Sequence, residues 1–126
     1  MNRFAGLQHI GLPVRSVETT RSFYERLGFR TLYSTSDGTS EVAFLGLNGL
    51  VIEVYEKTEF SGSGSTWDHL AIEVNDIEGT WCDIVTNLGF ASIEGEIKFL
   101  PFWDNGIRFF SIHGPDNEKI EFCQKL

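Results

Sequence analysis

The sequence has little cysteine and no long hydrophobic run. Its 126 residues include two cysteines, Cys82 and Cys123, which are too few for the disulfide framework that stabilises many small secreted domains. We therefore expect a cytoplasmic protein. No apolar stretch approaches the roughly 20 residues that a membrane-spanning helix needs, and residues 1–10 lack the apolar core of a secretory signal peptide. No membrane association is expected.

Positive charge is also scarce. Ten lysine and arginine residues stand against 18 aspartate and glutamate residues, giving a formal net charge of −8. Nucleic acids and anionic membranes bind basic faces, so this balance disfavours both as partners. The length is that of one ordinary domain and the chain is 41% hydrophobic, so it can bury a core. A small-molecule enzyme or a small-molecule binding module remains.

The chain contains an internal repeat. Residues 8–18 read QHIGLPVRSVE and residues 68–78 read DHLAIEVNDIE, with a histidine at the second position of each. Seven residues after each histidine comes a good helix N-cap, and a glycine suited to end the helix follows. The matched positions are His9 and His69, the caps Ser16 and Asp76, and the glycines Gly28 and Gly89.

Each half then continues with strand-like segments. We predict strands near 29–35, 40–46 and 49–56 in the first half, and near 91–99, 106–112 and 118–124 in the second. The predicted helices present apolar stripes formed by Val17, Tyr24 and Leu27, and by Ile77, Trp81, Ile84 and Leu88. The class is therefore α+β, with two tandem βαβββ modules at 1–60 and 66–126. The SGSGS run at 61–65 is a Gly/Ser linker, and together they form one domain.

Strand alternation places the histidine and a glutamate on one face of each module. Ile52 and Val54 point one way and Glu53 the other; Ile120 and Phe122 point one way and Glu121 the other. The apolar faces should pack on the helices, which leaves His9, Glu53, His69 and Glu121 on the opposite face. If the modules curve around a common cavity, these two imidazoles and two carboxylates form a mixed nitrogen and oxygen site for one divalent transition ion.

This pattern resembles the glyoxalase I / vicinal oxygen chelate superfamily over nearly the whole chain. The segments that carry the resemblance are QHIGLPVRSVETTRSFYERLGF, GLVIEVYE, DHLAIEVNDIE and GPDNEKIEFCQ. In them His9, Glu53, His69 and Glu121 match the glyoxalase I metal ligands one by one. The resemblance implies a cupped mixed sheet around the metal, a homodimer, and a compact bacterial lactoylglutathione lyase-like enzyme. It favours Ni²⁺ or Co²⁺, with Zn²⁺, Fe²⁺ or Mn²⁺ as further possibilities.

The resemblance also implies a reaction. In glyoxalase I-like enzymes the metal stabilises an enediolate while a metal-bound carboxylate moves a proton beside a carbonyl. It assigns that role to Glu121, with Glu53 as its partner in the other half, acting on a hemithioacetal or a related substrate with vicinal oxygens. The alternatives are an epimerase or an Fe(II) dioxygenase on the same metal site, and a metal-free drug-binding module of bleomycin-resistance type. The complete ligand set argues against the last of these.

Other candidate residues concern the substrate. Compact glyoxalase I enzymes hold glutathione with an Arg and an Asn where this chain has Pro13 and Lys57, so the thiol need not be glutathione. Arg15 and Lys57 are candidate substitutes. Phe102 and Trp103 could line an apolar substrate pocket or form dimer contacts. We expect a surface or turn role for His113 and a packing role for Cys123.

Overall fold

The computed structural model describes residues 3–36, 41–59, 66–115 and 117–126. By its internal contacts the chain divides into a first unit, His9–Asp68, and a second unit, Met1–Gln8 together with His69–Leu126. This division differs from a cut at the Gly/Ser run, because the beginning of β1 groups with the second unit. The predicted linker at 61–65 lies outside the described residues. No helix among the described residues is long and apolar enough to cross a membrane.

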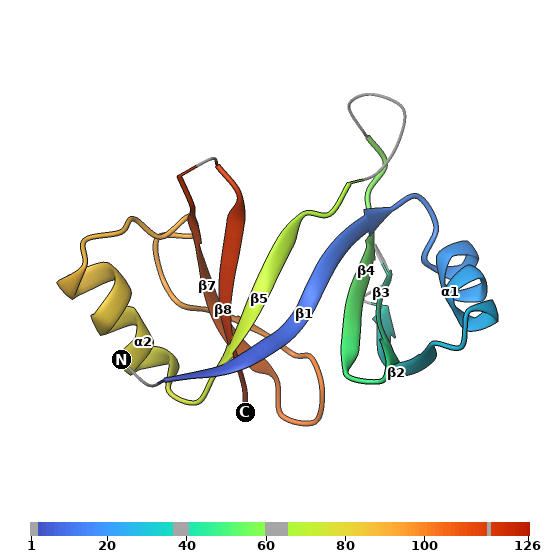
Figure 1. Cartoon of the computed structure of the whole chain (residues 1–126), viewed down its shortest axis with the longest axis horizontal. Coiled ribbons are helices and arrows are strands. Elements are labelled where there is room, and N and C mark those ends of the chain that lie inside the picture. Colours follow the sequence, from blue (N-terminus) through green and yellow to red (C-terminus); the bar gives the residue numbers. More distant parts are fainter. Residues whose placement is uncertain (1–2, 37–40, 60–65, 116) are drawn as a thin grey trace. The chain divides into compact units, whose positions relative to one another are not determined.

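The first unit is a β-α-β-β-β module, as the sequence predicts (Figure 1). Strand β4 pairs in parallel with β1 and antiparallel with β3, and β3 pairs antiparallel with β2. The order is therefore β2-β3-β4-β1. The elements are β1 (Phe4–Val14), α1 (Val17–Arg26), β2 (Arg30–Ser36), β3 (Glu41–Leu47) and β4 (Leu50–Glu56).

The second unit repeats this plan. Strand β8 pairs in parallel with β5 and antiparallel with β7, and β7 pairs antiparallel with a short β6. The order is β5-β8-β7-β6. The elements are β5 (His69–Val74), α2 (Ile77–Trp81), a π-helical continuation (Cys82–Asn87), β6 (Lys98–Leu100), β7 (Ile107–His113) and β8 (Lys119–Lys125). The predicted α+β class and both βαβββ modules are confirmed.

Both helices begin at the predicted caps. The side chains of Ser16 and Asp76 accept hydrogen bonds from the backbone N–H groups of Thr19 and Gly79, which satisfies donors that have no partner inside the helix. The repeat extends to a second contact at each helix start. The first helical N–H, on Val17 or Ile77, donates to a side chain of the last strand of its unit. These acceptors are Glu56 Oε2 at 3.2 Å and Gln124 Oε1 at 2.9 Å.

Each unit has its own hydrophobic core on the helix side of its sheet. In the first unit Val17 and Tyr24 of α1 pack with Ile52 and Val54. In the second unit the core contains a group of aromatic rings, in which Phe110 lies 5.0 Å from Trp81 and 5.1 Å from Phe122 between ring centroids. The predicted core faces of β4 and β8 are therefore confirmed.

Three details of the prediction are wrong. Leu27 and Leu88 are exposed, because Leu27 is already the C-cap of α1 and Leu88 follows the π-helical turns, whose wider spacing breaks the 3.6-residue stripe. The predicted strand at 91–99 is reduced to β6. Before β6 the chain makes a turn, in which Gly95 has a φ of +83° and its N–H donates to Ser92 Oγ.

Arg3, just before β1, forms ion pairs with the N-cap of α2 and with the π-helical segment that follows α2. Arg3 Nη1 lies 2.6 Å from Asp76 and Arg3 Nε lies 2.8 Å from Asp83. The hydrogen bond to Asp83 raises the pKa of the Arg3 guanidinium. These contacts explain why the first residues of the chain group with the second unit.

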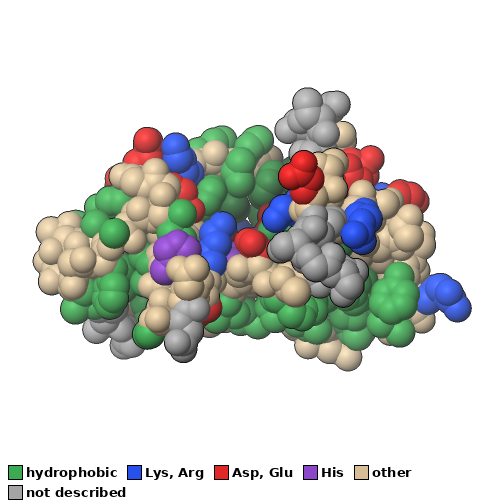
Figure 2. Space-filling model, turned by 90° about the horizontal axis from the view of Figure 1, so that it is seen from above, with side chains coloured by type: hydrophobic (Ala, Val, Ile, Leu, Met, Phe, Trp, Pro, Cys, Tyr) green, Lys and Arg blue, Asp and Glu red, His purple; other side chains and the backbone are tan. Residues whose placement is uncertain are grey.

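On the face seen in Figure 2, acidic and basic side chains are interspersed among hydrophobic ones.

Candidate metal centre

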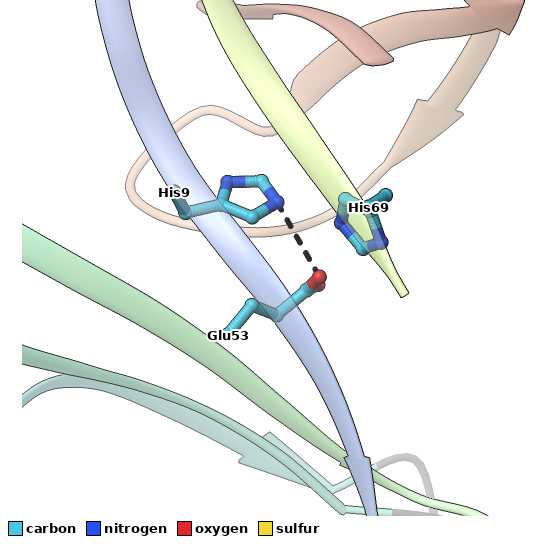
Figure 3. A group of neighbouring side chains, drawn as sticks. All are labelled: His9, Glu53 and His69. Atoms are coloured by element: carbon cyan, nitrogen blue, oxygen red, sulfur yellow. Dashed lines mark ion pairs between the residues drawn. The ribbon is translucent and has the colours of Figure 1, made fainter. Parts of the chain in front are cut away.

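In the first unit, His9 and Glu53 form a buried pair. His9 lies on β1 and Glu53 on the parallel strand β4, where Glu53 is paired with Gly11. His9 Nε2 lies 3.4 Å from Glu53 Oε1 (Figure 3). The side chains are 2% exposed for His9 and 13% exposed for Glu53. The predicted placement of both side chains on the face opposite α1 therefore agrees with the structure.

An aromatic side chain completes this half of the site. Phe44 on β3 is the antiparallel partner of Glu53, so the two side chains share a face of the sheet. The ring of Phe44 meets the His9 imidazole edge-on, with centroids 5.4 Å apart and planes at 82°. Phe44 is itself 1% exposed. His9 and Glu53 are thus held against an apolar surface.

The second unit contains the matching pair. His69 begins β5 and Glu121 lies on the parallel strand β8, paired with Ala71. His69 Nε2 lies 3.7 Å from Glu121 Oε1, and both residues are buried. The antiparallel partner of Glu121, on β7, is Ser111. The corresponding strand position is therefore aromatic in the first unit and a hydroxyl in the second.

Sequence reasoning did not single out Phe44 or Ser111. The signal that could have found them is hairpin register. Each residue lies opposite a predicted ligand across the turn that joins the last two strands of its half. That register depends on turn length, and the two turns differ by one residue in the spacing, nine between Phe44 and Glu53 and ten between Ser111 and Glu121.

The two histidines lie where the chain passes from one unit to the other. The division falls at the Gln8–His9 and Asp68–His69 peptide bonds. Gln8 is anchored in the second unit, since its side-chain amide donates to Glu73 Oε1 and to the Cys123 carbonyl, each at 3.2 Å. Asp68 is anchored in the first, since its N–H donates to the Gly11 carbonyl at 2.8 Å.

The donor chemistry fits a divalent transition ion. Each pair offers one imidazole nitrogen and one carboxylate oxygen, and mixed nitrogen and oxygen donors suit Zn²⁺, Ni²⁺, Co²⁺, Mn²⁺ or Fe²⁺. A carboxylate removed from water is costly unless it is paired or binds a cation. Each pair alone supplies two donors, and together they supply the four predicted ligands.

The candidate substrate residues lie in two places. Arg15 and Lys57 are exposed at the ends of β1 and β4, which run side by side because the Lys57 N–H donates to the Val14 carbonyl. In the second unit Phe102 is buried, and the half-buried Trp103 has Lys125 Nζ 4.1 Å from its ring centroid. A substrate role for these four residues stays a prediction.

The third histidine and the two cysteines have no proposed ligand role. His113 is exposed at the end of β7, in keeping with the expected surface role. Cys123 is buried on β8 and Cys82 is exposed. Cys123 lies two residues beyond Glu121, and its carbonyl accepts the hydrogen bond from Gln8. Its burial agrees with the expected packing role.

The chain is similar to known proteins over nearly its whole length. The family model described as the Glyoxalase/Bleomycin resistance protein/Dioxygenase superfamily matches residues 6–122. The uncharacterized protein YwbC of Bacillus subtilis (strain 168) is 31% identical over 127 residues, which cover 94% of this chain and 97% of that protein.

Solved structures share the fold. The hypothetical protein BH1468 from Bacillus halodurans C-125 is 26% identical, with a TM-score of 0.74 over 95% of this chain and 94% of that one. Methylmalonyl-CoA epimerase from Mycobacterium tuberculosis is 20% identical, with a TM-score of 0.78 over 98% and 89%. A Mn(II)-bound glyoxalase from Novosphingobium aromaticivorans is 17% identical, with a TM-score of 0.68 over 98% of this chain and 40% of that one.

Proposed function

Because the chain belongs to the Glyoxalase/Bleomycin resistance protein/Dioxygenase superfamily, we propose that it is a metal-dependent enzyme of glyoxalase I type. Its reaction moves a proton between carbon atoms beside a carbonyl. The observation that carries the proposal is the pair of buried histidine–glutamate contacts, His9 with Glu53 at 3.4 Å and His69 with Glu121 at 3.7 Å, at equivalent places of a repeated module. A drug-binding module needs neither pair.

The proposed ligands of one divalent ion are His9, Glu53, His69 and Glu121. Support comes from their donor chemistry and from the burial of His9, His69 and Glu121. When bound, such an ion acts as a Lewis acid that stabilises negative charge developing on substrate oxygens. Ni²⁺ or Co²⁺ is the preferred ion, with Zn²⁺, Fe²⁺ or Mn²⁺ as alternatives; the Mn(II)-bound glyoxalase with the same fold supports the choice of a divalent ion.

The proton is carried by a carboxylate. We assign this role to Glu121, which would take the proton from the substrate carbon and return it to the neighbouring carbon. Glu53 is its counterpart in the first unit and would act mainly as a ligand. Glu121 is 7% exposed, and such burial would limit the access of water that competes for the proton.

The substrate is a hemithioacetal or a related compound with two vicinal oxygens. Pro13 and Lys57 stand where glutathione-using relatives hold the tripeptide, so a thiol other than glutathione is proposed. Arg15 and Lys57 are exposed cations at adjacent strand ends, where they would pair with a carboxylate of the thiol. Phe102 and Trp103 would contact the apolar part of the substrate.

Epimerisation is the second candidate. It needs the same proton transfer beside a carbonyl, and two methylmalonyl-CoA epimerase structures superpose on nearly the whole chain with TM-scores of 0.78 and 0.79. A third reading, an Fe(II) dioxygenase on the same ligands, rests on redox chemistry at the ion and would not need Glu121 as a base.

One experiment separates these readings. The protein is purified without added metal, its metal content is measured, and it is reconstituted with Ni²⁺, Co²⁺, Zn²⁺, Mn²⁺ or Fe²⁺. It is then assayed with methylglyoxal plus a panel of thiols, with an acyl-CoA epimer, and with a catechol under oxygen. Metal-dependent thioester formation with one of the thiols is the expected result. Turnover of the epimer or the catechol alone would overturn the glyoxalase I-type reaction, and the absence of any metal binding would overturn the proposal as a whole.

We also propose a homodimer in the cytoplasm. Three apolar residues of the second unit, Phe4, Leu7 and Leu70, are each more than 40% exposed and could be covered by a second copy of the chain. Closed two-fold dimers are the commonest small assembly. Sedimentation at micromolar concentration should give twice the mass of the chain. A monomer that carries its full metal content would contradict the dimer without affecting the proposed reaction.

A further inference from the structure

Ser111 carries a buried hydroxyl with no hydrogen-bond partner within the part of the chain that the structure describes. The residue is 0% exposed, and its Oγ has no partner. Its backbone is fully occupied, because the N–H donates to Glu94 Oε1 at 2.7 Å and the carbonyl accepts from the Ile93 N–H at 2.8 Å. The hydroxyl is therefore not needed to complete the backbone hydrogen bonds of β7. A buried hydroxyl without a partner destabilises a fold.

The register of the sheet places this hydroxyl beside Glu121. Ser111 and Glu121 are direct partners in the antiparallel pair β7–β8, so their side chains lie on the same face, with Cβ atoms roughly 5 Å apart. The neighbours Phe110 and Ile112 belong to the core on the opposite face. Ser111 Oγ thus lies on the face of the second unit that carries His69 and Glu121.

The first unit shows that the fold does not require a hydroxyl here. The partner of Glu53 is Phe44, which packs its ring against His9. The same position of a repeated module therefore accepts a large apolar side chain in one unit and holds an unpartnered hydroxyl in the other. A general structural reason for the hydroxyl would apply to both units, so the reason is specific to the side of the site at Glu121.

We propose that Ser111 orients the substrate by donating a hydrogen bond from its hydroxyl to a substrate oxygen held beside Glu121. This inference rests on the proposed function and adds a polar contact on the side where the proton is moved. It implies a substrate whose reacting end presents an oxygen acceptor to β7, as a carbonyl or a vicinal diol oxygen would. The hydroxyl gains its missing partner when that substrate binds.

The test uses acetohydroxamic acid, a small molecule with two vicinal oxygens, on Ni²⁺-loaded protein. Three variants are compared with the unchanged chain: Ser111→Ala, which removes the hydroxyl; Ser111→Cys, which keeps the volume but donates weakly; and Thr31→Val as the control. Thr31 on β2 of the first unit also has a buried hydroxyl without a hydrogen-bond partner among the described residues, and its strand carries none of the proposed ligands. Calorimetry gives the affinities for Ni²⁺ and for acetohydroxamic acid, and thermal unfolding gives the stabilities.

We expect all three variants to bind Ni²⁺ as the unchanged chain does and to be no less stable, because each loses or weakens an unpaired hydroxyl. Both Ser111 variants should bind acetohydroxamic acid about threefold to tenfold more weakly, the usual effect of one neutral hydrogen bond, and Thr31→Val should bind it normally.

The remaining outcomes each count against the inference. Unchanged acetohydroxamic acid binding by Ser111→Ala would overturn it and leave the proposed metal site intact. Loss of Ni²⁺ affinity in the Ser111 variants would mean that the residue shapes the metal site instead. Loss of stability in Ser111→Ala together with normal binding by Ser111→Cys would assign it a packing role. Failure of the unchanged chain to bind Ni²⁺ would overturn the proposed function and the inference together.

Discussion

The two units have the same architecture and differ in what surrounds their histidine–glutamate pairs. In the first unit Phe44 packs on His9, opposite Glu53; in the second, Ser111 lies opposite Glu121. The histidine–glutamate contacts themselves differ by only 0.3 Å, 3.4 against 3.7 Å. The comparison indicates that the histidine–glutamate pair is the shared part of the module, while the residue across the hairpin can differ between the units.

The largest expected difference between the units is catalytic. Glu121→Gln keeps an oxygen donor but cannot accept a proton near neutral pH, so turnover of a working substrate should fall by ~10²–10⁴-fold. Glu53→Gln should lower it much less, since Glu53 is proposed as a ligand. Steady-state kinetics on metal-loaded variants checks both, with metal content measured in each sample. Equal losses in the two variants would remove the proposed division of roles.

The cores should also respond differently. Phe110 has 0% exposure and contacts both Trp81 and Phe122, so Phe110→Ala should reduce the free energy of unfolding by about 3–5 kcal/mol. The fully buried Val54 of the first unit loses only two carbon atoms in Val54→Ala, which should cost about 2 kcal/mol. Urea unfolding measures both. A larger loss for Val54→Ala would mean that the aromatic group is not the main source of stability in the second core.

The helix caps give the smallest difference. Ser16→Ala removes one capping hydrogen bond and should cost about 1 kcal/mol of unfolding free energy. Asp76→Ala also removes the ion pair with Arg3, and exposed ion pairs add roughly 0.2–1 kcal/mol. Asp76→Ala should therefore cost more unfolding free energy than Ser16→Ala. This excess should shrink at high salt and disappear in an Arg3→Gln background. An excess that survives in that background cannot come from the ion pair.

The repeat made most of the fold predictable. The histidines, caps and closing glycines located both helix starts and gave the same succession of elements in each half, and strand alternation placed Glu53 and Glu121 on the face opposite the helices. The predictions that were wrong depend on local backbone geometry, which a periodic sequence pattern does not reveal. The π-helical turns at Cys82–Asn87 moved Leu88 out of the core, and side-chain hydrogen bonds around Ser92 replaced most of a predicted strand.

The site was predictable only in part, for a similar reason. The proposed ligands can be found in one sequence because they recur at equal places, whereas Ser111 and Phe44 differ between the halves and are found only through hairpin register. Charge gave no information about the substrate, since Arg15 and Lys57 are exposed cations like many others.

The central proposal is that the two half-sites, His9 with Glu53 and His69 with Glu121, bind one ion together. Titration of metal-free protein with Ni²⁺ in a calorimeter tests this directly, on the unchanged chain and on His9→Ala and His69→Ala. The account predicts one ion per chain, with binding strongly weakened by either substitution even though each removes a ligand from a different unit. Two ions per chain, with one lost in each variant, would show that the half-sites bind separately and would contradict the account, as would no binding at all.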